Sequence, residues 1–218
     1  MWCVPKLTDE FVERMKDVLD LYEASYTQTE PVICIDEKPL QLLEDSRDPI
    51  PARKSGMIKR VDYEYKRKGT ANVFSVVEPK AGRHFAYVSE RKTGIDFAKI
   101  LYRIVRNYKN TRTIHLVMDN YSTHSFKSLV NRYGESKAKT IWDRFTVHYT
   151  PKHASWLNQA EIEIGILSRQ CLGTKRFGTI CELRKSVNAW KKRINKNKVI
   201  INWKFTTKDA MRKFKLES

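Results

Sequence analysis

Three acidic residues, Asp36, Asp119 and Glu161, stand where this sequence could build a metal-dependent site. Asp36 follows the apolar run Val32-Ile-Cys-Ile35, and Asp119 follows Ile114-His-Leu-Val-Met118. Both runs are too short for a helix and contain β-branched residues, so they indicate buried strands. A carboxylate at the carboxyl end of such a strand is where open α/β sheets usually carry chemistry.

Carboxylate oxygens are the hard ligands that Mg²⁺ and Mn²⁺ prefer in proteins. Two such ions, held about 4 Å apart, can activate a nucleophile and stabilise the leaving oxygen when a phosphodiester is cleaved. We therefore expect Asp36, Asp119 and Glu161 to converge on one site that holds divalent metal, with two ions. Each strand-end acid also has a simpler explanation, Asp119 as a turn residue and Asp36 as a helix or loop cap.

Spacing alone does not identify the third acid. Asn158-Gln-Ala-Glu161 has the spacing of a capping box, in which Glu161 would bond to the Asn158 backbone and take no part in chemistry. Glu161 and Glu163 fall on opposite flanks of the expected apolar stripe, so only one of them can face a given site. That stripe consists of Leu157, Ala160, Ile164, Leu167 and Cys171.

The rest of the pattern predicts the elements that position these acids. Apolar residues at helical spacing predict helices over residues 8–25, 93–108, 125–133, 162–172, 180–195 and 207–214. Alternating or continuous apolar runs predict strands over residues 32–36, 61–65, 70–77, 83–89, 113–119 and 145–149, with a turn at 66–69. A long crossover helix between two strands makes them parallel neighbours, which would bring Asp36 and Asp119 to the same sheet edge.

Composition indicates a polyanionic partner. The chain has 218 residues, and 42 Lys and Arg stand against 25 Asp and Glu, for a net charge of +17. Such an excess favours DNA or RNA, although a lysine-rich protein without that partner is the simpler alternative. Four cysteines without metal-type spacing, and no signal peptide or membrane-length apolar run, lead us to expect a reduced, cytoplasmic protein.

Several cations are candidates for contacts with a phosphate backbone, and a solvated side chain is the alternative for each. Lys152 and Arg169 flank the third acid, and Arg47 lies in the loop after the first strand. The polar face of the helix at 180–195 adds Arg184, Lys191 and Lys192. His124, five residues after Asp119, is either a loop or capping residue or a ligand, and the sequence leaves both open.

Four phrases occur in a characteristic order. They are Cys34-Ile-Asp-Glu-Lys-Pro-Leu-Gln41, Tyr63-Glu-Tyr-Lys-Arg-Lys-Gly-Thr70, Val117-Met-Asp-Asn-Tyr-Ser-Thr-His124 and His153-Ala-Ser-Trp-Leu-Asn-Gln-Ala-Glu161. Together they resemble the DDE transposases of the mariner-type superfamily, in the bacterial insertion-sequence branch. The likeness extends over nearly the whole chain.

This resemblance implies an α/β, ribonuclease-H-like mixed sheet flanked by helices. It implies metal-dependent DNA cleavage and strand transfer of an insertion sequence by Asp36, Asp119 and Glu161, with Glu161 rather than Glu163 as the third acid. The implied cofactor is Mg²⁺ or Mn²⁺. The implied partner is double-stranded DNA, as element ends and target, and a homodimer in a synaptic complex is a family-level expectation.

We expect a helical lead-in over residues 1–30, a catalytic core over 31–175 and a basic helical extension over 176–218. Family members usually carry helix-turn-helix modules before the core, whereas only about thirty residues precede the first expected strand here. We therefore expect a catalytic domain alone, a split reading frame or a truncated element. Two alternatives remain: an inactive, element-derived DNA-binding protein, and a basic structural protein that binds RNA.

Overall fold

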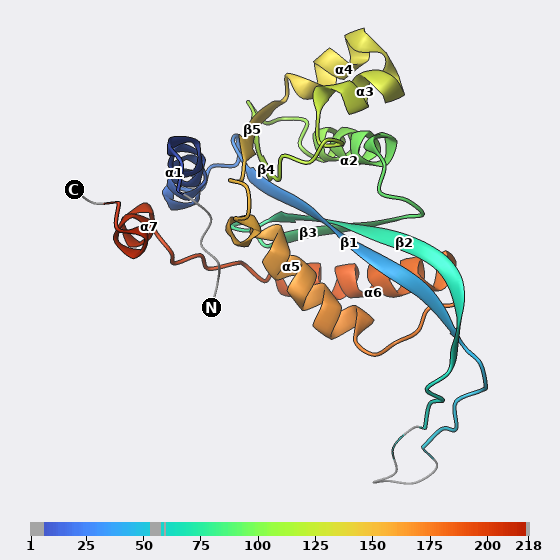
Figure 1. The fold of residues 1–218 in the computed structure, drawn as a ribbon. Helices are drawn as coiled ribbons and strands as arrows, with labels where there is room; N and C mark the ends of the chain where they lie inside the picture. Colours follow the sequence, from blue (N-terminus) through green and yellow to red (C-terminus); the bar gives the residue numbers. More distant parts are fainter. Residues whose placement is uncertain (1–6, 53–57, 59, 217–218) are drawn as a thin grey trace.

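The computed structural model describes residues 7–52, 58 and 60–216, which form a five-stranded mixed sheet with helices on both faces (Figure 1). The strands are β1 (Val32–Asp45), β2 (Tyr65–Glu78), β3 (Arg83–Ser89), β4 (Ile114–Met118) and β5 (Phe145–Tyr149), in the order β3-β2-β1-β4-β5. β1 pairs in parallel with β4, and β4 with β5, while β2 is antiparallel to β1 and β3. The expected parallel pair of strands is therefore confirmed.

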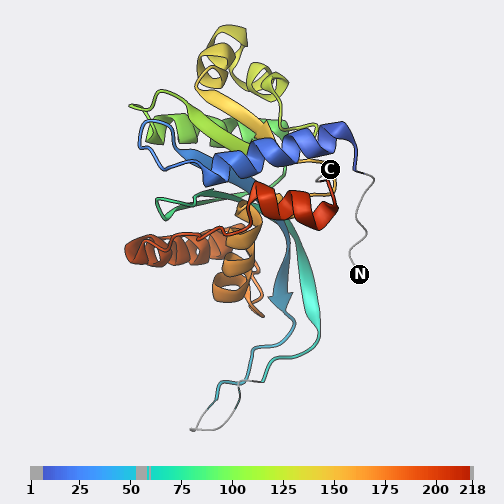
Figure 2. The same cartoon turned by 90° about the vertical axis from the view of Figure 1, so that its left-hand side faces the viewer.

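Alternate residues of the central strand face different helices. Ile33 and Ile35 pack in the core under α2 (Gly94–Asn107), α3 (Phe126–Tyr133) and α4 (Glu135–Trp142). Cys34 faces α1 (Asp9–Glu23) and α7 (Thr207–Phe214), which lie side by side in Figure 2. Farther along β1, Leu42 lies under α5 (Ala160–Leu167) and α6 (Ile180–Asn197). The acids on β1 thus sit in a strand covered on both faces.

The expectation that β1 ends at Asp36 was wrong, because the strand continues to Asp45. β2 supplies its hydrogen bonds beyond the point where β4 stops, as far as the pair Asp45 and Tyr65. The turn expected at 66–69 is also part of a strand, because β2 continues through these residues. The pairing of β1 with β2 shifts register at this point, and Gly69, with φ of +107°, lies in the resulting β-bulge. Residues 61–64 are correspondingly not a strand.

The helices follow the expected pattern closely. Thr8 caps α1 and Thr93 caps α2, each accepting a hydrogen bond from a backbone N–H. A short helix, α4, was not expected, and Gly134 at φ of +78° separates it from α3. In the part of the chain that the structure describes, every helix is too short or too polar to span a bilayer.

Candidate active site

Asp36 and Asp119 occupy equivalent places on two neighbouring parallel strands. Cys34 of β1 lies opposite Val117 of β4, and each acid stands two residues farther along its chain. β4 ends at Met118, so Asp119 begins the loop while Asp36 remains in strand. Strand register alone therefore brings the two carboxylates side by side at the end of β4.

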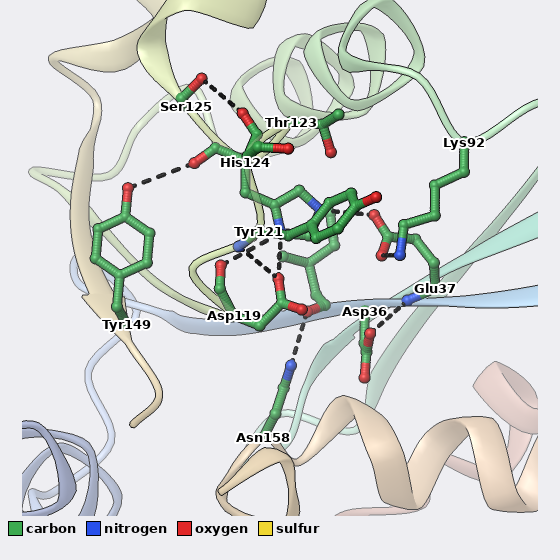
Figure 3. A network of polar contacts seen from close by, with 12 residues as sticks. Asp36, Glu37, Lys92, Asp119, Tyr121, Thr123, His124, Ser125, Tyr149 and Asn158 are labelled. Atoms are coloured by element: carbon green, nitrogen blue, oxygen red, sulfur yellow. Dashed lines mark hydrogen bonds and ion pairs between the residues drawn. The ribbon is translucent and has the colours of Figure 1, made fainter. Parts of the chain in front are cut away.

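Glu161 is delivered by the first turn of α5, which is fixed to β1 by Asn158. The Asn158 side chain donates a 2.8 Å hydrogen bond to the Ile35 carbonyl (Figure 3). It also accepts a hydrogen bond of 3.1 Å from the Ala160 N–H. The Asn158 N–H itself donates to the Ser155 carbonyl at 2.8 Å, so it is already satisfied. Glu161 is exposed and free of the capping-box role.

The companion acid on the same helix, Glu163, points elsewhere. It is fully buried, and its Oε1 lies 2.9 Å from Nδ1 of His84 on β3. Nε2 of His84 in turn lies 2.8 Å from the Val199 carbonyl, which ties the chain after α6 to the sheet. The expected apolar stripe was therefore wrong at one position, because Glu163 rather than the half-buried Ile164 faces inward.

Asp36 lies where several negative charges meet. Burial raises its pKa to about 6, a hydrogen bond of 2.7 Å from the Glu37 N–H to Oδ1 opposes this, and the charges of Glu37, Glu161 and Asp119 raise it further. Like charges held together favour protonation of one of them. The three expected acids are thus electrostatically coupled, with Asp36 at the centre.

A hydrogen-bonded chain through the buried side chains of His124 and Glu37 holds Asp119 in place (Figure 3). His124 has Nδ1 2.5 Å from Asp119 Oδ1 and Nε2 2.7 Å from Glu37 Oε1. Its ring stacks on Phe97 with centroids 4.5 Å apart. Lys92 Nζ lies 3.1 Å from Glu37 Oε2, close enough for attraction between the charges.

The protonation of this chain follows from its contacts. Burial by itself would lower the pKa of His124, but bonds to Asp119 and Glu37 raise it to about 9. Burial would raise the pKa of Asp119, but the contacts with His124 lower it overall. At neutral pH a charged imidazolium therefore lies between two carboxylates and fixes Asp119 Oδ1. Asp119 Oδ1 also accepts a 3.3 Å bond from the Tyr121 N–H.

Strand alternation turns the side chain of Glu37 away from Asp36, toward the opposite face of β1. Alternation holds, but Glu37 reaches Asp119 from the other face through His124. The position of His124, which the sequence left open, is a buried bridge between acids. No spacing rule connects Glu37 with His124, since their contact spans 87 positions of the chain.

The donor set fits a divalent ion. Asp36 and Asp119 each use Oδ1 for a hydrogen bond, and neither Oδ2 has a partner among the described residues. The carboxylate of Glu161 likewise has no hydrogen bond or ion pair among the described residues. These are hard, negatively charged oxygens of the kind that bind Mg²⁺ and Mn²⁺. Among the described residues, however, no three acidic, His or Cys side chains already form a closed metal-binding cluster.

One expected phosphate contact lies beside the acids. Lys152 and its neighbour His153 line a pocket together with Asp119 and Tyr121. Lys152 is exposed, and His153 has φ of +61°, a backbone conformation that is costly outside glycine. The loop after β5 therefore presents a cation next to Asp119.

The other expected contacts lie farther from the acids. Arg47 is exposed on the long hairpin of β1 and β2, which projects from the body, and pairs with Asp62 at 3.5 Å (Figure 1). Arg169 lies past the end of α5, with its guanidinium against Gly165. The remaining three, Arg184, Lys191 and Lys192, are on α6.

Solved structures share this arrangement of strands and helices. A Mos1 mariner paired-end complex with Mn has a TM-score of 0.58 at 14% identity, over 88% of this chain and 58% of that one. The catalytic domain of Mos1 mariner transposase has a TM-score of 0.56 at 12% identity, over 88% and 85% of the two chains. The ribonuclease-H-like fold is thereby confirmed. This chain spans less than two thirds of the paired-end-complex protein.

The family model of DDE superfamily endonucleases matches residues 31–184, which contain Asp36, Asp119 and Glu161. The match covers more than half of the chain, and the chain belongs to this family. Among proteins with curated annotation, none matches the sequence significantly. The chain is thus a member of the DDE superfamily endonucleases with a ribonuclease-H-like fold.

Proposed function

We propose that this protein cleaves DNA and transfers strands as the catalytic domain of an insertion-sequence transposase, with Asp36, Asp119 and Glu161 as metal ligands. The observation that carries the proposal is the coupling of these three acids, two of them at one strand register, in a chain of the DDE family. Bound Mg²⁺ or Mn²⁺ would activate the attacking oxygen and stabilise the leaving one. Similar transposase structures contain Mn or Mg.

The chain's own residues orient the reacting groups. His124 holds one oxygen of Asp119, which leaves the other directed to a ligand, and Asn158 fixes the turn that carries Glu161 against β1. Lys152, next to Asp119, supplies a positive charge for a phosphate oxygen. Water and then a DNA 3′-hydroxyl would attack in line, so no covalent protein–DNA intermediate is needed.

Nicking of supercoiled plasmid DNA in Mg²⁺ or Mn²⁺ tests the proposal. Asp36→Asn, Asp119→Asn and Glu161→Gln should each abolish nicking and weaken Mn²⁺ binding in calorimetry. Glu135→Gln, on the exposed first turn of α4, is the matched control and should change neither measurement. Full nicking by Asp119→Asn protein would refute the assignment.

The alternative of an inactive, element-derived DNA-binding protein makes a different prediction. Wild-type protein would then bind duplex DNA but show no nicking and no Mn²⁺ binding. The absence of a closed metal cluster among the described residues is the observation in its favour. The same plasmid and calorimetry experiments therefore decide between the two functions.

A further inference from the structure

A second surface, away from the acids, has the character of a polyanion site. It is a groove lined by residues of β3, the edge strand of the sheet, of α2 and of α6. In Figure 1, α2 and α6 lie on opposite faces of the sheet. Its volume is about 620 Å³, roughly twice the 290 Å³ of the pocket beside Asp119. The groove is therefore the larger of the two spaces.

Cations from separate elements meet in this groove. Arg91, Lys99, Arg103 and Arg184 line it, from the β3–α2 loop, α2 and α6. Arg103 lies over the ring of Tyr87 at 5.1 Å, and Lys191 lies over the same ring at 6.0 Å. The tyrosine of the edge strand thus stands between two positive charges.

These charges are poorly neutralised. Two acids line the groove: Glu90 is exposed and forms no ion pair among the described residues, and Asp96 already accepts hydrogen bonds from Thr93 and Lys99 in the first turn of α2. Within the described parts of the chain, Arg103, Arg184 and Lys191 form no ion pair with a carboxylate. Burial lowers the pKa of Lys191, and the charges of Arg103 and Lys192 lower it further. The cations of the groove outnumber its two acids, and an added anion would relieve the repulsion between them.

A chain of side-chain contacts connects the end of the groove with the acids. Arg91 and Thr93 line it, and between them Lys92 turns to Glu37, which bonds to His124 beside Asp119. From Thr93 to Arg103 the path along α2 is about 15 Å, at a rise of about 1.5 Å per residue. That length corresponds to about four nucleotides of one strand, at about 3.4 Å each.

We propose that this groove, named here the β3-edge groove, binds backbone phosphates of duplex DNA whose continuation reaches the acids. The proposal rests on the proposed function, because it assigns the substrate's path beyond the cleavage point. Arg103, Arg184 and Lys191 hold the phosphates. The aromatic ring of Tyr87 positions the side chains of Arg103 and Lys191. The contacts are to the backbone, so they add affinity without sequence preference.

The first test measures binding rather than cleavage, so that the two proposals fail separately. A triple variant, Arg103→Ala, Arg184→Ala and Lys191→Ala, is made in the Asp119→Asn background and titrated with duplex DNA without metal. The plot of log affinity against log salt concentration should become shallower by about 2.7, since each phosphate that the protein no longer neutralises removes about 0.9 from the slope. Thermal unfolding of the same variants checks that they are folded.

The matched control removes three lysines that do not line the groove, on α1 and on or just before α7: Lys16→Ala, Lys204→Ala and Lys208→Ala. This variant has the same change in net charge, and we expect its slope to stay within about 0.9 of the parent slope, which is the value for one phosphate. Equal changes of slope in the two variants would show that overall charge alone attracts DNA, and would overturn the proposal.

Chemical protection provides a second test in the unaltered protein. Saturating duplex DNA should protect Lys99 and Lys191 from acylation, measured by mass spectrometry, while Lys208 stays reactive. Protection of Lys191 by single-stranded RNA but not by duplex DNA would contradict the proposal, as would no protection by either. If duplex DNA protects these lysines but the unaltered protein does not nick plasmid DNA, the proposed function fails and the groove assignment stands.

Discussion

Replacing Asp36 with Asn should stabilise the metal-free protein while it removes metal binding. The Asp36 carboxyl has a folded-state pKa of about 6 against an ordinary value of 3.8, because burial and neighbouring acids disfavour its charge. Asn has a similar shape and can accept the same bond from the Glu37 N–H. The variant therefore loses the unfavourable charge and keeps the strand geometry.

The sign and size follow from proton linkage. Between pH 4 and 6 the folded state binds more protons at Asp36 than the unfolded state, so stability falls as pH rises through this window. At about 1.36 kcal/mol per pKa unit, the ionised side chain costs about 3 kcal/mol at pH 8. Asp36→Asn should raise the free energy of unfolding by about 3 kcal/mol at pH 8 and about half of that at pH 5.

Urea unfolding, followed by tryptophan fluorescence at pH 5 and pH 8, measures this difference. Asp119→Asn is an informative comparison, since the contacts with His124 lower the pKa of Asp119 and its charge stabilises the fold above its ordinary pKa. That variant should be less stable than wild type at pH 8. Saturating Mn²⁺, at about 100 times its dissociation constant, should stabilise wild type by about 2.7 kcal/mol and neither variant. An Asp36→Asn protein that is no more stable than wild type at pH 8 would refute the reasoning.

Other predictions concern the residues that support the fold and the site. Glu37→Gln removes one carboxylate from His124, so its pKa should fall from about 9 in an NMR titration, and an unchanged pKa would contradict the bridge. Glu163→Ala leaves His84 without its buried partner and should cost about 1 to 3 kcal/mol in urea unfolding, with nicking per folded molecule retained. Trp190→Ala, in the core between α6 and the sheet, should cost about 3 to 5 kcal/mol in the same measurement, and a cost below about 1 kcal/mol would contradict that packing.

Much of the fold could be predicted from local patterns. The helices capped by Thr8 and Thr93 and the parallel pair of strands follow from apolar periodicity and from the crossover rule. The length of β1 could not be predicted in this way, because its continuation to Asp45 depends on pairing with β2 and on a bulge at Gly69. Pairing across a long hairpin leaves little trace in either strand alone.

The candidate site, too, could be predicted only in part from the sequence. Register places Asp36 beside Asp119 as expected from two apolar runs, but spacing could not choose between Glu161 and Glu163. The structure separates them, because Glu163 is buried against His84 while Glu161 is exposed near Asp36. Which glutamate faces the site depends on contacts with other helices and strands, and the helical spacing of a sequence contains no information on those contacts.

The central claim is that three acids share one divalent-metal site. An anomalous scattering map from crystals grown with Mn²⁺ tests it most directly. We expect density about 2 Å from the free oxygens of Asp36 and Asp119, with Glu161 turned toward it. Manganese bound elsewhere in the molecule, with these three carboxylates untouched, would contradict the claim.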